Sequence, residues 1–280
     1  MALLQAQFDR WFQATQQWGP LSQAHSSIFR LTCLLVEEGR PDEQVLQITR
    51  NACRSIQRRP VPERELVSAL NYAKQGTDRV VQRWALFDPA LRSEIAKTAS
   101  LADLKAASPQ FPHTGEEALA ALFPGDPLIC MGQTVDRFKT GPLSKWKGLS
   151  NGQFVVPNPM TTPLGKTMDG RPSARTNSNT GPRTYQVVEF DTGTFDTHAA
   201  ILLHLSTEVP LVMAVYSGSK SLHGWFRVKG MTAAAQREFF ESAVRLGADH
   251  RMWTPSQFSR LPLGRNSRTN KAQEVFYFNP

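Results

Sequence analysis

The stretch 185-YQVVEFD-191 reads as a hydrophobic strand that ends in two acids, and 211-LVMAVYSGSKSLHGWFRV-228 adds two apolar runs joined by a turn of small residues. A fourth run, 275-VFYF-278, stands near the end of the sequence. Val, Phe, Tyr and Leu fit the half-buried surface of a sheet, and Gly and Ser favour the turns between strands. The sequence therefore predicts strands over residues 185–190, 211–217, 222–228 and 275–278.

Two segments between these strands, about 195–206 and 232–246, have the character of helices. The resulting order is strand, helix, strand, strand, helix, strand, which is the order of the split βαβ units in RRM-like and ferredoxin-like folds. We therefore expect an α+β core of that kind. Since this fold serves both enzymes and passive RNA-binding proteins, it does not decide the function.

The first 107 residues read as a series of helices, because their apolar residues recur three and four positions apart. Helices are expected from about Ser26 to Glu38 and after the start signals Pro41-Asp42, Pro60 with Pro62, and Asp88-Pro89. After Ser108 the pattern changes to a long stretch that Pro and Gly interrupt and that lacks helical periodicity. We expect a helical domain over residues 1–107 and a second domain over residues 108–280.

The composition is that of a globular protein with an excess of base. The 280 residues include 32 Lys and Arg against 24 Asp and Glu, a formal net charge of +8, and 40% are hydrophobic. No apolar run approaches the roughly 18 residues that a membrane span needs, so no membrane association is expected. The three cysteines are odd in number and far apart, which favours a reducing, cytoplasmic location and offers no zinc site of the Cys type.

Much of the base lies in one loop-rich segment. Residues 137–183 contain eight Lys and Arg and a single acid, Asp169, and a second basic tract without acids runs from Arg251 to Lys271. Such tracts can hold phosphate groups of a nucleic acid through charge and exposed backbone N–H groups. The alternative is a solvated basic loop with no partner.

Two acids stand at the end of the first predicted strand. Glu189 and Asp191 are two residues apart, so a strand projects them to one side while Phe190 points to the other. Two adjacent carboxylates repel unless a cation neutralises them, and their hard oxygen atoms suit Mg²⁺ or Mn²⁺. The alternative is a strand end that runs into a polar turn.

A second group of polar residues lies between the next two predicted strands. The period of a strand places Ser221 and His223 on one side, Lys220 adds positive charge, and Gly218 lets backbone N–H groups approach an anion. This set fits a triphosphate, although a lone strand histidine can also be a hydrogen-bonded structural residue. Farther on, Asp249 follows the second predicted helix and could be no more than a polar residue at its end.

The order of these elements resembles the archaeo-eukaryotic primase superfamily, and within it the primase-polymerases of phages, plasmids and other mobile genetic elements. The resemblance rests on a hydrophobic strand with acid-x-acid, then Ser-x-His within 217-SGSKSLHGW-225, then an acid followed by 255-PSQFSRLP-262. It covers about residues 123–280. The first acid is Glu189 where Asp is commoner in that family.

The resemblance implies roles for individual residues. Glu189, Asp191 and Asp249 would be catalytic ligands of a two-metal Mg²⁺ or Mn²⁺ site, with His223 beside them. The residues that would bind the incoming NTP or dNTP are Lys220, Ser221, His223 and Arg260. The residues that would bind a single-stranded DNA template are Lys145, Lys147, Lys166, Arg171, Arg175 and Arg265.

These roles lead to an expected function. The chain would be a template-dependent nucleotidyltransferase that makes primers by two-metal-ion phosphoryl transfer during replication of a mobile genetic element. Two alternatives stay open: a non-catalytic accessory protein that binds single-stranded nucleic acid, and a gap-filling repair polymerase of the same superfamily. Gly165-Lys166-Thr167 lacks the earlier glycine of a P-loop, because Met160 stands in its place, so any duplex unwinding would come from a partner such as a replicative helicase.

Overall fold

The computed structural model describes residues 31–33, 35–36, 40–56, 62–78, 84–167 and 169–280. The chain divides into two compact units, Met1–Arg83 and Trp84–Pro280. None of the described helices is both long enough and apolar enough to cross a bilayer.

The first unit contains two of the helices that the sequence predicts. They are α3 (Asp42–Ile56) and α4 (Glu63–Asp78), and both carry acids in the first turn, which complement the helix dipole. Leu35, Val45 and Leu70 form a small shared core. The helix expected from about Ser26 to Glu38 falls largely outside the described residues.

The second unit contains the predicted strands and helices at nearly the expected positions. The strands are β6 (Tyr185–Glu189), β7 (Leu211–Tyr216), β8 (Leu222–Arg227) and β10 (Val275–Phe278), and the helices are α8 (Phe195–Leu205) and α9 (Ala233–Arg245). The strands form one antiparallel sheet in the order β10-β7-β8-β6. The α+β character of this part of the chain is therefore confirmed.

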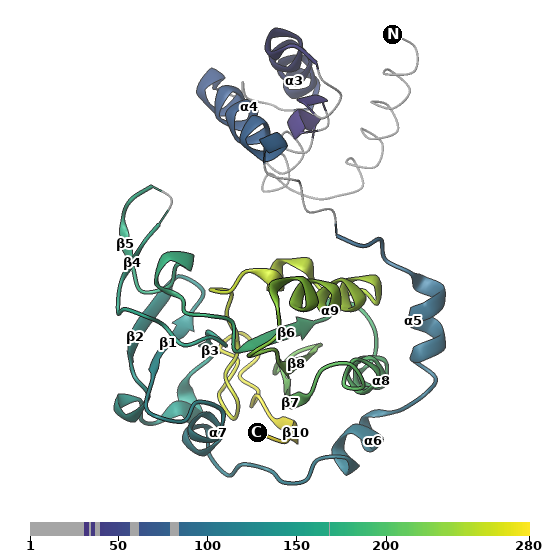
Figure 1. The fold of residues 1–280 in the computed structure, drawn as a ribbon, viewed down its shortest axis with the longest axis vertical. Helices are drawn as coiled ribbons and strands as arrows, with labels where there is room; N and C mark the ends of the chain where they lie inside the picture. Colours follow the sequence, from purple (N-terminus) through teal and green to yellow (C-terminus); the bar gives the residue numbers. More distant parts are fainter. Residues whose placement is uncertain (1–30, 34, 37–39, 57–61, 79–83, 168) are drawn as a thin grey trace. The chain divides into compact units, whose positions relative to one another are not determined.

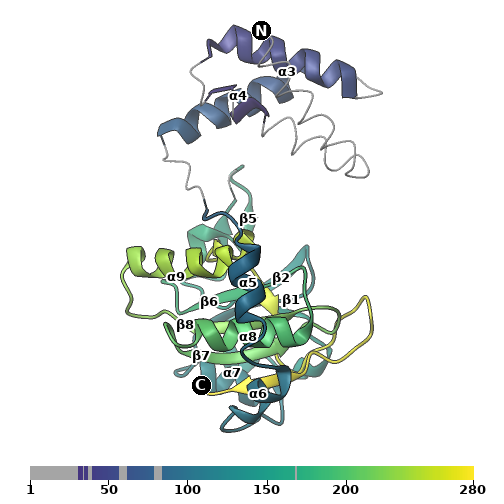
Figure 2. The same cartoon turned by 90° about the vertical axis from the view of Figure 1, so that its right-hand side faces the viewer.

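This sheet lies in the middle of the second unit. Helices α8 and α9 cover one of its faces, and a second sheet lies on the other side (Figures 1 and 2). Trp225 and Phe226 of β8 are fully buried, and so is Phe190, which continues β6. Burial of large side chains on both sides of the strands fixes the register.

The strand order differs from the ferredoxin-like arrangement in one respect. That arrangement places the last strand beside the first, whereas here β10 pairs with β7 on the opposite edge. The chain between α9 and β10 does not cross over directly. It first forms η4 (His250–Trp253) and β9 (Ser259–Arg260), and β9 joins the second sheet. After this segment the chain reaches the edge of the first sheet opposite β6, where β10 pairs with β7.

The second sheet was not predicted from the sequence. Residues 108–184 were expected to be loop-rich, but they form α7 (Gly115–Leu122), β1 (Leu128–Thr134), β2 (Arg137–Pro142) and β3 (Phe154–Val155). The sheet has the order β2-β1-β3-β9. A separate hairpin consists of β4 (Gly165–Lys166) and β5 (Pro172–Ser173). Short 3-10 turns connect these strands: η1 (Leu143–Lys145), η2 (Leu149–Asn151) and η3 (Asn177–Asn179).

The second unit begins about 24 residues before the boundary that the sequence placed after residue 107. Helices α5 (Pro89–Ile95) and α6 (Leu101–Ala106) belong to it. Ile95 and Leu104 are buried in its main core, and Figure 2 shows α5 in front of α8. The boundary moves because these short helices bury their apolar residues against the sheet domain.

Candidate active site

A pocket of about 220 Å³ opens between the two sheets, and four of the residues singled out above line it: Glu189, His223, Asp249 and Arg260. Glu189 comes from the end of β6, His223 from β8 and Arg260 from β9. Asp249 stands directly before η4 and caps it. Residues that are 71 positions apart in the chain, Glu189 and Arg260, thus face one cavity.

Glu189 and His223 are direct partners in the pairing of β6 with β8. Oε1 of Glu189 lies 3.5 Å from Nε2 of His223. Burial raises the pKa of Glu189 to about 7, and the negative charges of Asp249 and Asp191 contribute to the rise. The three carboxylates therefore lie close enough to repel one another.

His223 is buried and uncharged. Burial lowers its pKa to about 3, and the positive charge of Arg260 adds to this effect. Its Nε2 lies 3.3 Å from Oγ of Ser221, and its Nδ1 lies 3.2 Å from Oγ of Ser259. A neutral imidazole donates from one nitrogen and accepts at the other, so the two serines fix the ring. The contact with Glu189 is therefore not an ion pair.

Asp249 is tied to the strand that carries Glu189. Its backbone N–H donates to the carbonyl oxygen of Glu189 at 2.9 Å, and Ala248 bridges to Phe190. The carboxylate receives the Arg251 guanidinium, with Nη2 at 2.7 Å from Oδ2. Burial alone would raise the pKa of Asp249, but the hydrogen bonds and charge of Arg251 outweigh it and lower the pKa.

Asp191 stands at the rim of this site and is the most exposed of the three acids. Its carboxylate lies 3.5 Å from Nζ of Lys220 and 3.7 Å from Nη2 of Arg251. Lys220 also donates to the backbone oxygen of Asp191 at 2.9 Å. The lysine that the resemblance assigns to a triphosphate thus contacts an acid here.

The turn after Asp191 is held from inside the protein. Arg92 of α5 donates to the carbonyl oxygen of Thr192 and, at 3.0 Å, to that of Leu246. Nε2 of the buried His198 lies 3.0 Å from the same Thr192 oxygen. Gly193 has a φ of +110°, and a Cβ there would lie 2.6 Å from Nη2 of Arg92, so only glycine fits.

Ser221 and Gly218 differ in what they do. Ser221 is buried beside His223, on the same side of the strand as the sequence predicts, and Leu222 belongs to the main core. Gly218 has a φ of +71°, and a Cβ there would lie 2.7 Å from Cβ of Asn266. Close packing of the β7–β8 turn against the chain around Asn266 therefore accounts for this glycine.

Arg260 lies over the ring of Phe154, with its guanidinium carbon 4.8 Å from the ring centre. Its Nη1 contacts Oε1 of Gln273 at 3.5 Å. Burial lowers the pKa of Arg260, while the charge of Glu189 acts in the opposite direction. Stacked in this way, the guanidinium is a fixed positive group at the wall of the pocket.

The carboxylates have the right chemistry for Mg²⁺ or Mn²⁺, because both ions prefer hard oxygen ligands. Within the described ranges, however, no three Asp, Glu, His or Cys side chains are already grouped as a metal site. The guanidinium of Arg251 stands between Asp191 and Asp249 instead. Cation binding at these oxygens would require Arg251 to move.

The six candidate template-binding residues do not form one surface around this pocket. Lys145 and Lys147 are exposed near η1, and Lys166 and Arg171 lie on or beside the β4–β5 hairpin, which projects from the domain (Figure 1). Arg175 is half-buried, with its guanidinium carbon 4.7 Å from the ring centre of Phe138 and 4.9 Å from that of Phe258. The remaining residue, Arg265, is exposed and donates to the carbonyl oxygen of Asn270 at 2.8 Å.

Six residues that line the pocket were given no role from the sequence: Phe154, Arg251, Met252, Gln257, Phe258 and Ser259. Ser259 stands next to Arg260 in the segment that carries the resemblance, but strand alternation places adjacent residues on opposite faces and so does not predict that both reach the pocket. Arg251 follows Asp249 by two residues, which is the spacing of a capping carboxylate and its donor. No signal marks Phe154 in advance.

Comparison of the chain with protein-family models, with curated proteins and with solved structures found no match.

Proposed function

We propose that the chain is a template-dependent nucleotidyltransferase of the primase-polymerase type, acting on single-stranded DNA and nucleoside triphosphates. The observation that carries the proposal is the pocket in which Glu189 and Asp249 meet a neutral histidine and a fixed arginine. A pocket that only bound phosphates would gain nothing from carboxylates, because each repels the ligand. Replication of a mobile genetic element is the proposed setting.

The reaction would join a 3′-hydroxyl oxygen to the α-phosphorus of a nucleoside triphosphate and release pyrophosphate. Arg260 would stabilise negative charge on the phosphates, since its guanidinium is preset on the ring of Phe154. His223 would donate from Nε2 to a phosphate oxygen or a water in place of its contact with Ser221, without adding charge, because its pKa of about 3 keeps it neutral. Ser259 would orient the ring through Nδ1.

Glu189, Asp191 and Asp249 would hold Mg²⁺ or Mn²⁺, which would supply Lewis-acid activation of the hydroxyl and neutralise phosphate charge. The pKa of about 7 at Glu189 supports this role, because it reflects burial and carboxylate repulsion that a cation relieves. In the absence of a cation, Arg251 and Lys220 take over that neutralisation at Asp249 and Asp191.

The contact of Arg251 with Asp249 also favours a second candidate function. If the arginine neutralises Asp249 permanently, the domain would be a non-catalytic binder of single-stranded nucleic acid. The two candidates differ in whether cations enter the pocket. A gap-filling polymerase would share the pocket and differ only in its need for a primed template.

The test is synthesis by the purified protein on single-stranded templates with labelled NTPs or dNTPs and Mg²⁺ or Mn²⁺. The wild type is expected to give a metal-dependent product, and Asp191→Ala is expected to abolish synthesis while keeping DNA affinity, because it removes an exposed carboxylate. Glu208→Ala, which removes an exposed acid that follows α8 and does not line the pocket, is the matched control and should act as the wild type.

Two outcomes would redirect the proposal. DNA binding without product under every template, nucleotide and metal would favour the passive binder. Product on primed templates alone would favour the gap-filling polymerase, so primed and unprimed templates are compared side by side.

A further inference from the structure

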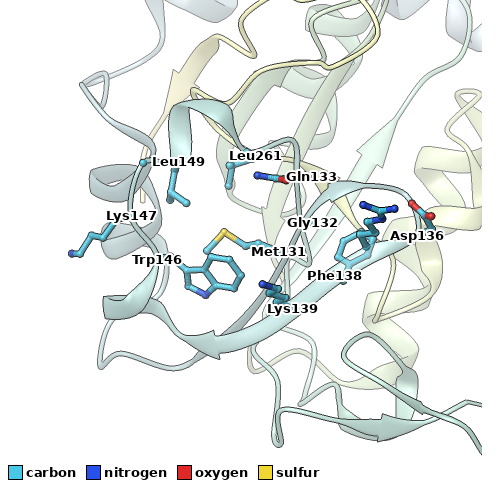
Figure 3. Close-up of a pocket in the computed structure, with 13 residues that line it drawn as sticks. Met131, Gly132, Gln133, Asp136, Phe138, Lys139, Trp146, Lys147, Leu149 and Leu261 are labelled. Atoms are coloured by element: carbon cyan, nitrogen blue, oxygen red, sulfur yellow. The ribbon is translucent and has the colours of Figure 1, made fainter.

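A second and larger pocket, of about 590 Å³, lies at the β1–β2 hairpin (Figure 3). Its floor is apolar and includes Met131, Leu149 and Leu261, with the indole of Trp146 beside them. The volume falls in the range of pockets that hold small organic groups, which is about 300–1,000 Å³. None of the residues that the resemblance assigns to catalysis or nucleotide binding lines it.

The pocket is preformed by contacts that fix its aromatic wall. Nε1 of Trp146 donates to the carbonyl oxygen of Gly141 at 3.3 Å, and the backbone N–H of Trp146 donates to Leu143 at 3.0 Å. Met131 and Lys139 are direct cross-strand partners and therefore share one face of the hairpin. Figure 3 shows both side chains close to the indole ring.

The rim of the pocket is basic. Arg137, Lys139 and Lys147 are exposed, and none of them lies within 4.0 Å of a carboxylate oxygen among the residues that the structure describes. At longer range Arg137 interacts with Asp136, the single acid of the lining, and Lys147 interacts with Glu116. Asp136 also accepts a hydrogen bond from the hydroxyl of Thr134 at 2.6 Å. Three exposed cations beside an apolar, aromatic floor suit an anion that carries a flat apolar ring.

The pocket also adjoins the candidate active site through the second sheet. Leu261 lines the pocket, and the residue before it, Arg260, lines the acidic pocket. Gly132 of β1 lines the pocket, and its cross-strand partner Phe154 lines the acidic one. The two pockets are therefore built on neighbouring residues of the same sheet.

We propose that this pocket binds one unpaired base of single-stranded DNA, stacked on Trp146, with the neighbouring phosphates on Lys139 and Lys147. The inference rests on the proposed function for its choice of DNA. Stacking on an aromatic ring together with a basic edge is the usual way to hold a single strand irrespective of sequence. The excess of positive charge at the rim, three cations against the single acid Asp136, favours this anionic ligand over an apolar protein surface.

The experiment measures the affinity of the full chain for a short fluorescent oligo(dT) by anisotropy, without nucleotides. Trp146→Ala is expected to weaken binding about tenfold, whereas Trp146→Phe should restore most of the affinity, since it keeps an aromatic face. Phe111→Ala, which removes an exposed aromatic ring outside the pocket, should bind as the wild type. Duplex DNA, which offers no unpaired base, should show no Trp146 effect.

The charges are tested by the salt dependence of the same binding. Lys139→Ala with Lys147→Ala should lower the slope of log affinity against log salt by about 1.4, since each lost phosphate contact on a single strand removes about 0.7. The exposed Lys229→Ala is the control and should leave the slope unchanged. These exposed lysines can be replaced without disturbing the core, so a folding defect of Trp146→Ala would not obscure the result.

The outcomes separate this inference from the proposed function. If all pocket variants bind DNA with the affinity and salt slope of the wild type and still make primers, the proposed base-binding role of the pocket is wrong and the proposed function stands. A series of oligonucleotides, each with one abasic site at a different position, provides a second test. At one position the missing base should make the affinity independent of Trp146. If Trp146→Ala weakens binding equally for every position of the abasic site, the proposed base pocket is wrong. Trp146-dependent binding in a protein that makes no product would leave the pocket standing and count against the enzyme.

Discussion

Nη2 of Arg251 lies 2.7 Å from Oδ2 of Asp249 and 3.7 Å from Oδ2 of Asp191. One guanidinium thus serves two carboxylates of the acidic pocket, and the pKa of Arg251 is raised by its hydrogen bond and charge interaction with Asp249. Because a cation bound to these oxygens would compete with the guanidinium, Arg251 lowers the affinity of the site for a metal ion.

Replacing Arg251 with alanine should therefore tighten Mn²⁺ binding to the nucleotide-free protein. A hydrogen bond to a charged group contributes about 1.5–3 kcal/mol, so a gain of about tenfold in affinity is expected. Titration calorimetry or Mn²⁺ paramagnetic resonance measures it directly. The exposed Arg245→Ala should bind Mn²⁺ as the wild type does. An unchanged dissociation constant in Arg251→Ala would show that Arg251 does not compete with the metal.

Arg92 should stabilise both the fold and the turn after Asp191. Arg92→Ala leaves the carbonyl oxygens of Thr192 and Leu246 without this donor, which costs about 2 kcal/mol for buried acceptors. Urea unfolding measures the loss, and primer synthesis should fall with it, because Asp191 precedes Thr192. Arg245→Ala removes only an exposed pair with Asp88 and should cost less than about 1 kcal/mol. Equal losses in the two variants would contradict the role of Arg92.

The sequence predicts the central sheet well because its strands carry their own pattern. Tyr185–Glu189 and Leu222–Arg227 combine apolar runs with turn residues at both ends, and these local signals suffice. In the second sheet only β1 carries a comparable apolar run, 128-LICM-131, which was not singled out from the sequence. Strands β3 and β9 of this sheet have two residues each, and they exist because Phe154 and Arg260 pair across more than 100 positions of the chain. Long-range pairing of this kind has no local signature.

The acidic pocket was predictable in part for the same reason. Alternation along β6 and β8 places Glu189 and His223 on the pocket side, and their direct pairing follows once the strands are neighbours. The position of Asp249 depends on a bridge between Ala248 and Phe190 that no sequence rule specifies. The contacts of the basic residues could not be predicted either: nothing in the sequence indicates that Arg175 packs against Phe138 and Phe258.

The stability of the metal-free protein should fall as pH rises through 7, because of Glu189. Its pKa of about 7 in the fold exceeds the ordinary 4.5, so the folded state binds more protons than the unfolded state between these values. The favourable contribution is complete below about pH 4.5 and is lost as pH rises through 7. Glu189→Gln does not ionise and should escape this loss, which is on the order of 3 kcal/mol at most.

Urea unfolding at about pH 5.5 and pH 8, with chelator present, measures this difference. The stability of Glu189→Gln relative to the wild type should increase between the two pH values, whereas that of the exposed Glu208→Gln should stay constant. A relative stability of Glu189→Gln that does not change with pH would mean that the carboxyl group ionises normally in the fold.

The boundary between the two units can be tested by truncation. A chain of residues 84–280 should fold cooperatively, because it keeps every element that contributes to the main core. A chain of residues 108–280 should not, since it loses the buried Ile95 and Leu104 and the ring of Trp84, whose centre lies 5.1 Å from that of Phe240. Loss of several buried side chains at about 2–5 kcal/mol each exceeds the stability of most domains.

Thermal unfolding followed by near-ultraviolet circular dichroism distinguishes the two truncated chains. The longer one should show a sharp transition, and the shorter one a weak aromatic signal without a cooperative midpoint. The 84–280 chain with Arg92→Ala should still unfold cooperatively, but at a lower temperature than the unsubstituted 84–280 chain. This comparison separates the loss of one hydrogen-bond donor from the loss of both helices. A sharp transition in the 108–280 chain would place α5 and α6 outside the folding unit and return the boundary to the position predicted from the sequence.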